Sequence, residues 1–201
     1  RRADGIICKS EELRAALPRQ RDRKRARVIG NGVDTNRFSP GDRVEARTRL
    51  GVGREETLVL FPHDRTQWAV KRFDLARAAI EMLQARQPGV RLWEVSGVSP
   101  VTMPDYYPAA DCLLLTSDHE GSPNVVKEAL CSDLPVVSVD AGDAKRWISL
   151  VSGSVMVERE ARAIADGLAR VLAGEGHVDG SPGRGVLSSD VIASEMLALY
   201  E

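Results

Sequence analysis

The sequence predicts an α/β fold, a doubly wound, Rossmann-like parallel sheet with helices on both faces. Short runs rich in Leu, Ile and Val alternate along the chain with longer amphipathic segments, which is the order typical of this class. Several of the short runs are apolar throughout, which indicates strands buried on both faces. The chain has 201 residues, enough for one large domain or for a domain and part of another.

Each element is expected from its local pattern. Apolar or β-branched runs predict strands at residues 5–8, 27–29, 57–61, 90–95, 112–116, 135–139 and 154–157. Amphipathic periodicity predicts helices near residues 11–17, 42–50, 71–86, 103–109, 123–131, 142–150, 160–173 and 189–200. The stretch from Gly174 to Gly185 is rich in Gly and polar residues, which predicts a mobile surface loop.

Composition and charge exclude several classes of protein. A formal charge of -1 gives no general attraction to nucleic acid, so no nucleic-acid partner is expected. The basic stretch 19–27 is short and carries Asp22. We therefore interpret it as a solvated connection rather than a patch that binds nucleic acid or an anionic surface. No apolar run approaches the roughly 20 residues of a membrane-spanning helix.

Cysteine usage indicates a reducing compartment. Cys8, Cys112 and Cys131 form no CxxC pair, and two of them lie in or beside apolar runs. No signal-peptide pattern opens the chain. The expected location is cytoplasmic, with peripheral attachment at the inner membrane surface as an alternative.

The stretch "SDHEGSPNVVKEAL" holds two glutamates, Glu120 and Glu128, with seven residues between them. The first follows the predicted strand at 112–116, and ligands of open α/β sheets bind at such carboxyl ends. The apolar stripe of the following helix leaves Asn124 and Glu128 on another face, so Glu128 is expected to point toward the loop of Glu120. An alternative is that Glu120 completes a local turn and Glu128 is a solvated helix residue.

The helix start after Glu120 is a predicted anion site. Ser122 is expected to cap the helix, with Pro123 at its first position. Amides near residues 122–125, together with the helix dipole, can bind phosphate, and Gly121 permits close approach. Carboxylates accept hydrogen bonds from sugar hydroxyls, so a ligand with both phosphate and vicinal hydroxyls fits this site.

Four stretches follow one another along the chain: "RVIGNGVDTNRFSP", "VKRFDLARAAIEML", "MPDYYPAADCLLLTS", and "EGSPNVVKEAL" followed by "LPVVSVDAGD". Together they resemble the retaining, nucleotide-sugar-dependent glycosyltransferases of family 4, the group 1 glycosyltransferases with a GT-B fold. They resemble, in order, the NGVD loop of the family, its Lys-containing helix start, the lead-in to its glutamates and its E-x7-E segment. The similarity runs from about Ala3 to the end of the chain.

The resemblance implies a role for individual residues. Glu120 and Lys71 would be the catalytic residues, Glu120 facing the donor sugar and Lys71 binding the diphosphate. Glu128 would hold the ribose hydroxyls. Arg72 would also contact the substrate, although it stands where the family often has Gly. The other implied substrate-binding residues are Gly121, Ser122, Pro123, Asn124 and Val125.

Some assignments stay open beside this resemblance. Lys71 and Arg72 could instead be solvated cations at a helix start, where they oppose the helix dipole. The arginine that follows the first strand in the family is not in register here, and His63 or Arg65 takes its place. Asp133 stands where the family has a Gly turn, and Asp tolerates the left-handed conformation.

The resemblance also implies how the chain is organised. Residues 1–26 would be the tail of a missing amino-terminal domain with its linker, and residues 27–201 the nucleotide-sugar donor-binding domain, the carboxyl-terminal half of a GT-B architecture. The implied reaction is transfer of a glycosyl group from a UDP- or GDP-linked sugar to an acceptor hydroxyl with retention. The missing half would bind the acceptor, a glycan or a lipid-linked sugar. No cofactor and no metal are expected, and the isolated chain is expected to transfer sugar poorly or not at all.

Parts of the sequence are compatible with other functions. Asp118 to Glu120, "DHE", resembles the acidic pair of metal-dependent transferases. A binding or scaffolding module of the same fold without turnover, and a sugar-nucleotide epimerase, are further alternatives. A nicotinamide dehydrogenase and a P-loop NTPase are excluded, because neither G-x-G-x-x-G after a strand nor G-x-x-x-x-G-K-[ST] is present.

Overall fold

The computed structural model describes residues 5–174 and 178–199 and confirms the α/β class. Its main sheet has five parallel strands in the order β4-β3-β5-β6-β7. The strands are β3 (Thr57–Pro62), β4 (Val90–Val95), β5 (Cys112–Leu115), β6 (Val136–Ser138) and β7 (Val155–Met156). Because all five run in the same direction, their carboxyl ends meet at one edge of the sheet.

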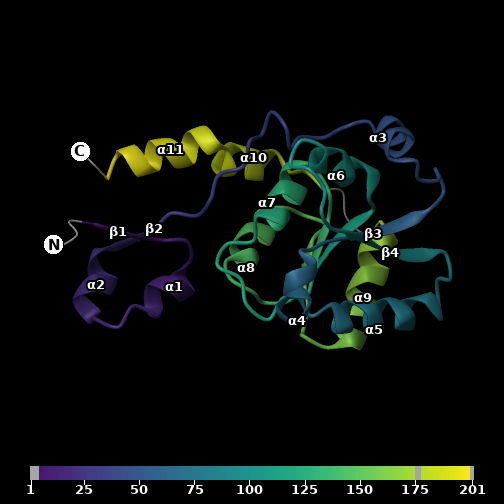
Figure 1. The fold of residues 1–201 in the computed structure, drawn as a ribbon, viewed down its shortest axis with the longest axis horizontal. Helices are drawn as coiled ribbons and strands as arrows, with labels where there is room; N and C mark the ends of the chain where they lie inside the picture. The colour runs from purple at the N-terminus through teal and green to yellow at the C-terminus, as the bar shows by residue number, and fades with distance from the viewer. Residues whose placement is uncertain (1–4, 175–177, 200–201) are drawn as a thin grey trace.

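The core lies on this sheet. Leu58 and Leu60 of β3 and Leu113 of β5 are fully buried, as expected for strands covered on both faces. Two groups of helices pack on the sheet (Figure 1). One group is α5 (Phe73–Gln84) with α9 (Ala161–Leu172); the other is α7 (Asn124–Cys131) with α8 (Ala144–Ile148) and α10 (Ser181–Leu187).

Helix α3 lies near the amino-terminal end of β5, where its Arg47 donates to the Ala109 carbonyl and to Asp111, each at 2.9 Å. Helix α3 (Arg43–Leu50) is capped by Asp42, which accepts from the Glu45 amide at 2.8 Å, and ends at Gly51 in the left-handed conformation with φ 66°. It packs on α6 (Tyr106–Ala109), which follows the short 3-10 helix η2 (Met103–Asp105). The helix predicted at 103–109 is therefore two short pieces.

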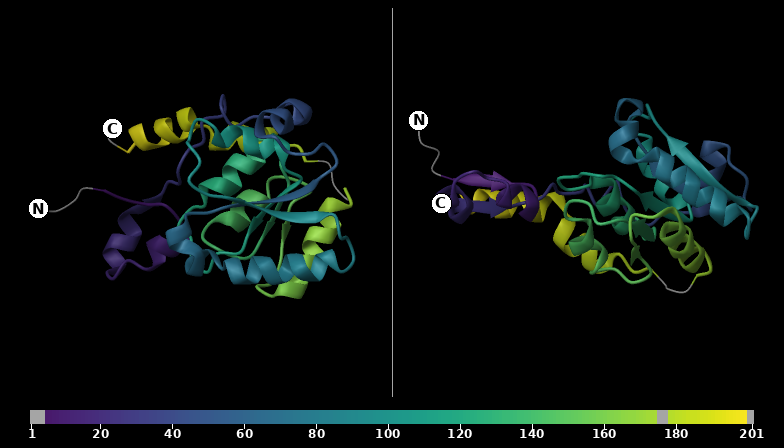
Figure 2. Two further views of the ribbon diagram at one scale, coloured as in Figure 1. Left: turned by 45° about the vertical axis from the view of Figure 1, so that its right-hand side comes forward. Right: turned by 90° about the horizontal axis from the view of Figure 1, so that it is seen from below.

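A second, two-stranded parallel sheet lies apart from the main one. It pairs β1 (Ile6–Cys8) with β2 (Ala26–Val28) and carries α1 (Glu11–Ala15) and α2 (Gln20–Arg25). Figure 2 shows this unit at one end of an elongated molecule, beside α11 (Ser189–Leu197). Residues 1–4 of the predicted amino-terminal tail lie outside the described residues.

The fold refines one sequence prediction and corrects two others. The basic stretch is solvent-exposed, as predicted, except at Asp22 and Ala26, but it contains helix α2. The helix predicted at 71–86 is broken at Arg72, which has φ 52° and separates α4 (Trp68–Lys71) from α5.

The loop predicted at 174–185 contains most of α10, although its residues 175–177 lie outside the described residues. Arg184 anchors that helix by donating to the Cys131 carbonyl at 2.9 Å and to Asp133 at 2.6 Å. Asp133 itself has φ 56°, which confirms its predicted left-handed conformation. Within the described ranges, no helix has the length and apolar character needed to cross a bilayer.

Candidate functional site

An ion pair marks the carboxyl edge of the sheet. Lys71 Nζ lies 2.5 Å from Glu120 Oε1, and both side chains are only 16% exposed. Ser117, which follows β5, donates its hydroxyl to the same carboxylate oxygen at 2.8 Å. The structure thus brings together the two predicted catalytic residues, which are far apart in the sequence.

The backbone at Arg72 is held in a conformation that disfavours side chains. A left-handed residue other than Gly costs roughly 1–2 kcal/mol, and here a residue distant in the sequence holds the backbone in this conformation. Thr116 donates its hydroxyl to the carbonyls of Lys71 at 2.7 Å and Arg72 at 3.2 Å. The left-handed φ of 52° explains physically why Gly suits this position in the family that the sequence resembles.

The Arg72 side chain is engaged by two carboxylates. Its guanidinium donates to Asp74 at 3.0 and 3.1 Å and to Asp118 at 3.2 Å. These hydrogen bonds raise the pKa of Arg72. Lys71 ends α4, so its charge does not oppose the dipole of the helix that follows, whereas Arg72 is the N-cap of α5 and stands at a helix start as predicted.

Glu128 is not a solvated helix residue. Tyr107, which is fully buried, donates its hydroxyl to Glu128 Oε2. Burial raises the pKa of Glu128, while the Tyr107 hydrogen bond and nearby Arg37 lower it by less. Tyr107 is held in turn by an edge-on ring contact with Phe38, at 5.6 Å between centroids. One carboxylate oxygen of Glu128 is therefore occupied by the protein.

The start of α7 differs from the predicted cap. The helix begins at Asn124, and Pro123 precedes it without a side-chain capping bond. Ser122 is not the cap, because its hydroxyl donates to Asp143 Oδ2 at 2.7 Å. A Cβ on Gly121 would lie 3.4 Å from the Leu13 side chain of α1, so this side of the loop faces α1.

A neighbouring loop supports the backbone of Glu120. A Cβ on Gly142 would lie 2.7 Å from the Gly121 carbonyl oxygen and 2.8 Å from that of Glu120. Gly142 also has φ 58°, so both its conformation and its surroundings require Gly. The segment after β6 thus packs directly on the loop that carries Glu120.

Arg159 is a site residue that the sequence reasoning missed. Its guanidinium donates to the Thr116 carbonyl at 3.1 Å, the Asp140 carbonyl at 2.8 Å and Asp118 Oδ1 at 3.3 Å, and it also donates to the Ser117 carbonyl. It ties the end of β5 to the segment after β6. The sequence did contain a signal for this residue: Arg159 follows the predicted strand at 154–157, which places it at the carboxyl edge of the sheet, beside Glu120.

A cavity of about 260 Å³ opens beside Lys71. It lies between the ends of β3 and β4 and the first turn of α7, where Val125 lines it. Part of the 96–103 segment contributes to its wall. The lining residues are Pro62, His63, Asp64, Gln67, Lys71, Val95, Ser96, Gly97, Val98, Met103 and Val125.

His63 does not supply a positive charge here. Its Nδ1 accepts a hydrogen bond from the Trp68 indole at 2.9 Å. Because the indole N–H can only donate, that nitrogen carries no proton in this geometry. The imidazole packs among Phe61, Trp68 and Phe73. His63 therefore does not replace the family arginine as a cation, and the side chain of Arg65 lies outside the described part of the structure.

The acidic pair considered for a metal site is already paired with cations. Asp118 accepts from Arg72 and Arg159, and Glu120 from Lys71. Across the described ranges, no three His, Cys, Asp or Glu side chains are placed to hold a metal ion. The donor set around Asp118 and Glu120 does not fit the metal-dependent alternative.

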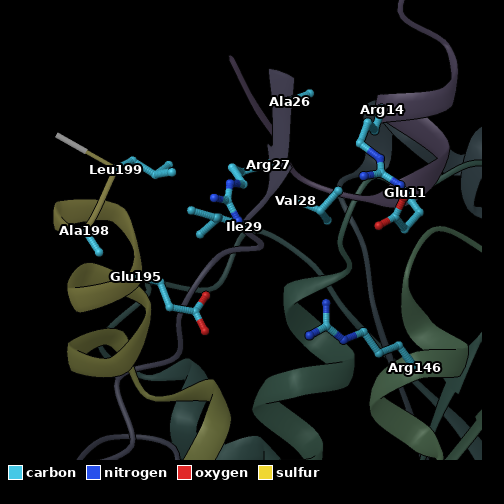
Figure 3. Close-up of a pocket in the computed structure, with 10 residues that line it drawn as sticks. All are labelled: Glu11, Arg14, Ala26, Arg27, Val28, Ile29, Arg146, Glu195, Ala198 and Leu199. Atoms are coloured by element: carbon cyan, nitrogen blue, oxygen red, sulfur yellow. Dashed lines mark ion pairs between the residues drawn. The ribbon is translucent and has the colours of Figure 1, made fainter. Parts of the chain in front are cut away.

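Figure 3 shows a second cavity, of about 470 Å³, between the small sheet, Arg146 of α8 and α11. Five charged side chains line it: Glu11, Arg14, Arg27, Arg146 and Glu195. Arg14 and Glu11 form an ion pair at 2.6 Å. None of the residues predicted to bind donor or substrate lines this cavity, so it is separate from the site around Lys71.

Comparison with known proteins agrees with the motifs. Residues 76–174 match the family model described as glycosyl transferases group 1. The match includes Glu120 and Glu128, whereas Lys71 and Arg72 precede it. This match confirms the resemblance to group 1 glycosyltransferases inferred from the sequence.

Curated relatives cover the chain only in part. The D-inositol 3-phosphate glycosyltransferase of Geodermatophilus obscurus is 29% identical over 187 residues, 76% of this chain and 41% of the relative. That of Nocardia farcinica is 31% identical over 153 residues, 60% of this chain and 34% of the relative. The putative teichuronic acid biosynthesis glycosyltransferase TuaC of Bacillus subtilis is 28% identical over 159 residues, with coverages of 71% and 40%. The chain thus spans less than half the length of these relatives.

Solved structures share the fold. Sucrose-phosphate synthase from Thermosynechococcus elongatus matches with a TM-score of 0.81 at 22% identity, over 99% of this chain and 58% of that one. Anabaena Alr3699/HepE, solved in complex with UDP-glucose, matches with a TM-score of 0.79 at 18% identity, over 100% of this chain and 64% of that one. These matches confirm the predicted fold class, that of the GT-B glycosyltransferases.

Proposed function

Because this chain carries the group 1 glycosyltransferase segment on a GT-B type fold, we propose that it supplies the donor-binding half of a retaining glycosyltransferase. The enzyme transfers a glycosyl group, a hexose, from a UDP- or GDP-linked sugar to an acceptor hydroxyl. The observation that carries the proposal is the Lys71–Glu120 pair at the carboxyl edge of the sheet, beside a cavity and the start of α7. HepE, a structural neighbour, was solved in complex with UDP-glucose.

Lys71 is proposed to stabilise the leaving diphosphate. Negative charge builds on that group as the glycosyl bond breaks, and a fixed cation lowers the energy of such a transition state. An ammonium has three donors, so Lys71 can keep Glu120 as a partner while it contacts phosphate. The amides at the start of α7 add donors and the positive end of a dipole.

Two glutamates are proposed to hold the sugars. Glu120, positioned by Lys71 and Ser117, accepts hydrogen bonds from hydroxyls of the transferred sugar. Glu128 uses Oε2 for Tyr107, which leaves Oε1 for the ribose hydroxyls. The base is proposed to lie against the 96–103 segment, part of which lines the cavity. Retention implies that acceptor and leaving group share one face of the donor sugar.

The proposed function implies two domains in the whole protein. Residues 27–201 form the donor-binding domain, and residues 1–26 belong with the half that binds the acceptor. The pairing of β2 with β1 favours a boundary close to Val28. A cytoplasmic location, with peripheral attachment at the inner membrane surface as an alternative, suits nucleotide-sugar donors and a glycan or lipid-linked acceptor. Residues 1–4, 175–177, 200 and 201 of these segments lie outside the described residues.

Calorimetric titration of this chain with UDP, GDP and their sugar conjugates tests the proposal. We expect saturable binding of one nucleotide series. Binding should weaken on the order of tenfold in Glu128→Gln, which keeps the shape and the Tyr107 bond but weakens the acceptor. Glu81→Gln, an exposed change on α5, serves as the control. A folded chain that binds neither series would refute donor binding.

The alternatives differ in turnover. A binding or scaffolding module predicts nucleotide-sugar binding with no release of sugar, and an epimerase predicts interconversion of the donor sugar. Incubation of a nucleotide sugar with the chain linked to its amino-terminal half separates the three. Release or transfer of sugar supports the transferase, since the other two functions leave the glycosyl–phosphate bond intact.

A further inference from the structure

Helix α7 carries a fully buried lysine next to Glu128. Lys127 is 0% exposed, and its ammonium donates to the Asn31 carbonyl at 3.0 Å. It lies 5.6 Å from the centroid of the Trp147 ring. Burial lowers the pKa of Lys127, and the charge of Asp143 opposes this shift. Lysine is almost never fully buried unless it is paired, so its position needs a physical reason.

The segment after β2 is packed tightly against this ammonium. A Cβ on Gly30 would lie 3.3 Å from Lys127 Nζ and 3.2 Å from Ser122 Oγ. Asn31 is also held through its side chain, which donates to Asn124 Oδ1 at 3.1 Å. Lys127 and Asn124, on one face of α7, therefore both hydrogen-bond to Asn31 in the segment that links β2 to the main sheet.

Asp143, the residue before helix α8, completes this cluster. Asp143 Oδ2 accepts from the Ser122 hydroxyl at 2.7 Å. Its other oxygen, Oδ1, is buried without a hydrogen-bond partner among the described residues. A Cβ on Gly30 would lie 3.3 Å from Lys127 Nζ and 3.6 Å from Asp143 Oδ2, so the ammonium and the carboxylate flank the same stretch of backbone, where their opposite charges attract.

We propose that Lys127 and Asp143 are positioning residues for the donor-binding loop, and this rests on the proposed function. Asp143 fixes the Ser122 side chain, and through it the Gly121–Ser122 backbone where the diphosphate is proposed to bind. Lys127 places a positive charge near Asp143. Its hydrogen bond to the Asn31 carbonyl also attaches α7 to the segment that follows β2. The Ser122 hydroxyl thus orients the loop instead of contacting the ligand.

The proposal predicts a selective effect on phosphate recognition. If Lys127 is replaced by Met, Asp143 loses its counter-charge and the Asn31 carbonyl loses its donor. The loop at Ser122 is then released, while the 96–103 segment that is proposed to bind the base keeps its contacts. Affinity for a nucleoside diphosphate should fall more than affinity for the corresponding monophosphate, which depends less on the loop.

Titration with UDP and UMP, and with GDP and GMP, measures this difference in Lys127→Met, Asp143→Asn and the double variant. We expect diphosphate affinity to fall on the order of tenfold in Lys127→Met, with a smaller loss for the monophosphate. The double variant, which buries no unpaired charge, should recover part of the loss. Lys145→Met, an exposed change on α8, is the control and should leave both affinities unchanged.

The possible results separate the two proposals. Wild-type chain that binds neither nucleotide refutes the donor site itself and with it the positioning role. Wild-type binding with equal losses for both nucleotides, or with none, overturns the positioning role alone. If Lys127→Met does not fold, Asp143→Asn and Ser122→Ala decide the matter by the same diphosphate-to-monophosphate comparison.

Discussion

Gly142→Ala is the sharpest test of how the donor loop is supported. The new Cβ would lie 2.7 Å from the Gly121 carbonyl oxygen and 2.8 Å from that of Glu120, both of them backbone atoms. The left-handed conformation costs alanine about 1–2 kcal/mol, and overpacking costs about 1–3 kcal/mol. The lower entropy of alanine in the unfolded chain returns about 0.4–1 kcal/mol. The expected net loss in the free energy of unfolding is about 2–4 kcal/mol.

Gly51→Ala provides a matched control for this substitution. Gly51 has φ 66°, close to the 58° of Gly142, but nothing lies within 4 Å of a Cβ built on it. It therefore carries the conformational cost without the clash, about 1 kcal/mol. The difference between the two variants isolates the contact between Gly142 and the loop of Glu120.

Urea denaturation of both variants gives the two free energies, and nucleotide titration gives their effect on the site. We expect Gly142→Ala to lose about 1–3 kcal/mol more than Gly51→Ala, and to bind nucleotide more weakly. Equal destabilisation of the two variants would refute the reasoning, because it would mean that the segment after β6 can move away from the Glu120 loop with no loss in the free energy of unfolding. Unchanged nucleotide binding in a folded Gly142→Ala variant would refute the link to the donor site.

Three further predictions follow from the site. Arg72→Gly should be more stable than Arg72→Ala by roughly 1 kcal/mol in urea denaturation, because both lose the carboxylate contacts but only Gly relieves the left-handed strain; the reverse order would contradict this. The raised pKa of Glu128 means that the folded state holds its proton more tightly than the unfolded state, so this residue's contribution to stability falls as pH rises from about 4.3 to the raised pKa. Glu128→Gln should therefore reduce that fall between pH 4 and 7, and an identical pH profile would argue against it. Lys71→Met should weaken nucleotide diphosphate binding on the order of tenfold or more in calorimetry, whereas unchanged affinity would remove Lys71 from the diphosphate site.

The sequence was sufficient for features that depend on neighbouring residues. The strand predicted at 90–95 has those bounds in β4, because an apolar run with β-branched residues is a local signal. The loop of Glu120 was placed at a carboxyl edge because strand and helix patterns alternate. Asp133 was assigned a left-handed conformation from its residue type and position, and it has φ 56°.

Local patterns were less reliable where tertiary contacts override them. Periodicity ran through Arg72 and predicted one helix, yet the bonds from Thr116 to the carbonyls of residues 71 and 72 hold a break there. Gly and polar residues predicted a loop at 174–185, yet Arg184 anchors helix α10 to Asp133. In both places the partner lies more than forty residues away, beyond any sequence window.

The tertiary structure alone decided which side chains meet at the site. Residue types and spacing indicated Lys71 and Glu120 separately, but only the parallel order of β3 and β5 brings their charges to 2.5 Å. The Tyr107 partner of Glu128 and the buried Lys127 carry no sequence signal, because the burial of a polar side chain depends on how distant segments pack around it. Sequence thus determined the elements and the edge where the site lies, and the packing of distant segments determined which charges are paired, buried or left for a ligand.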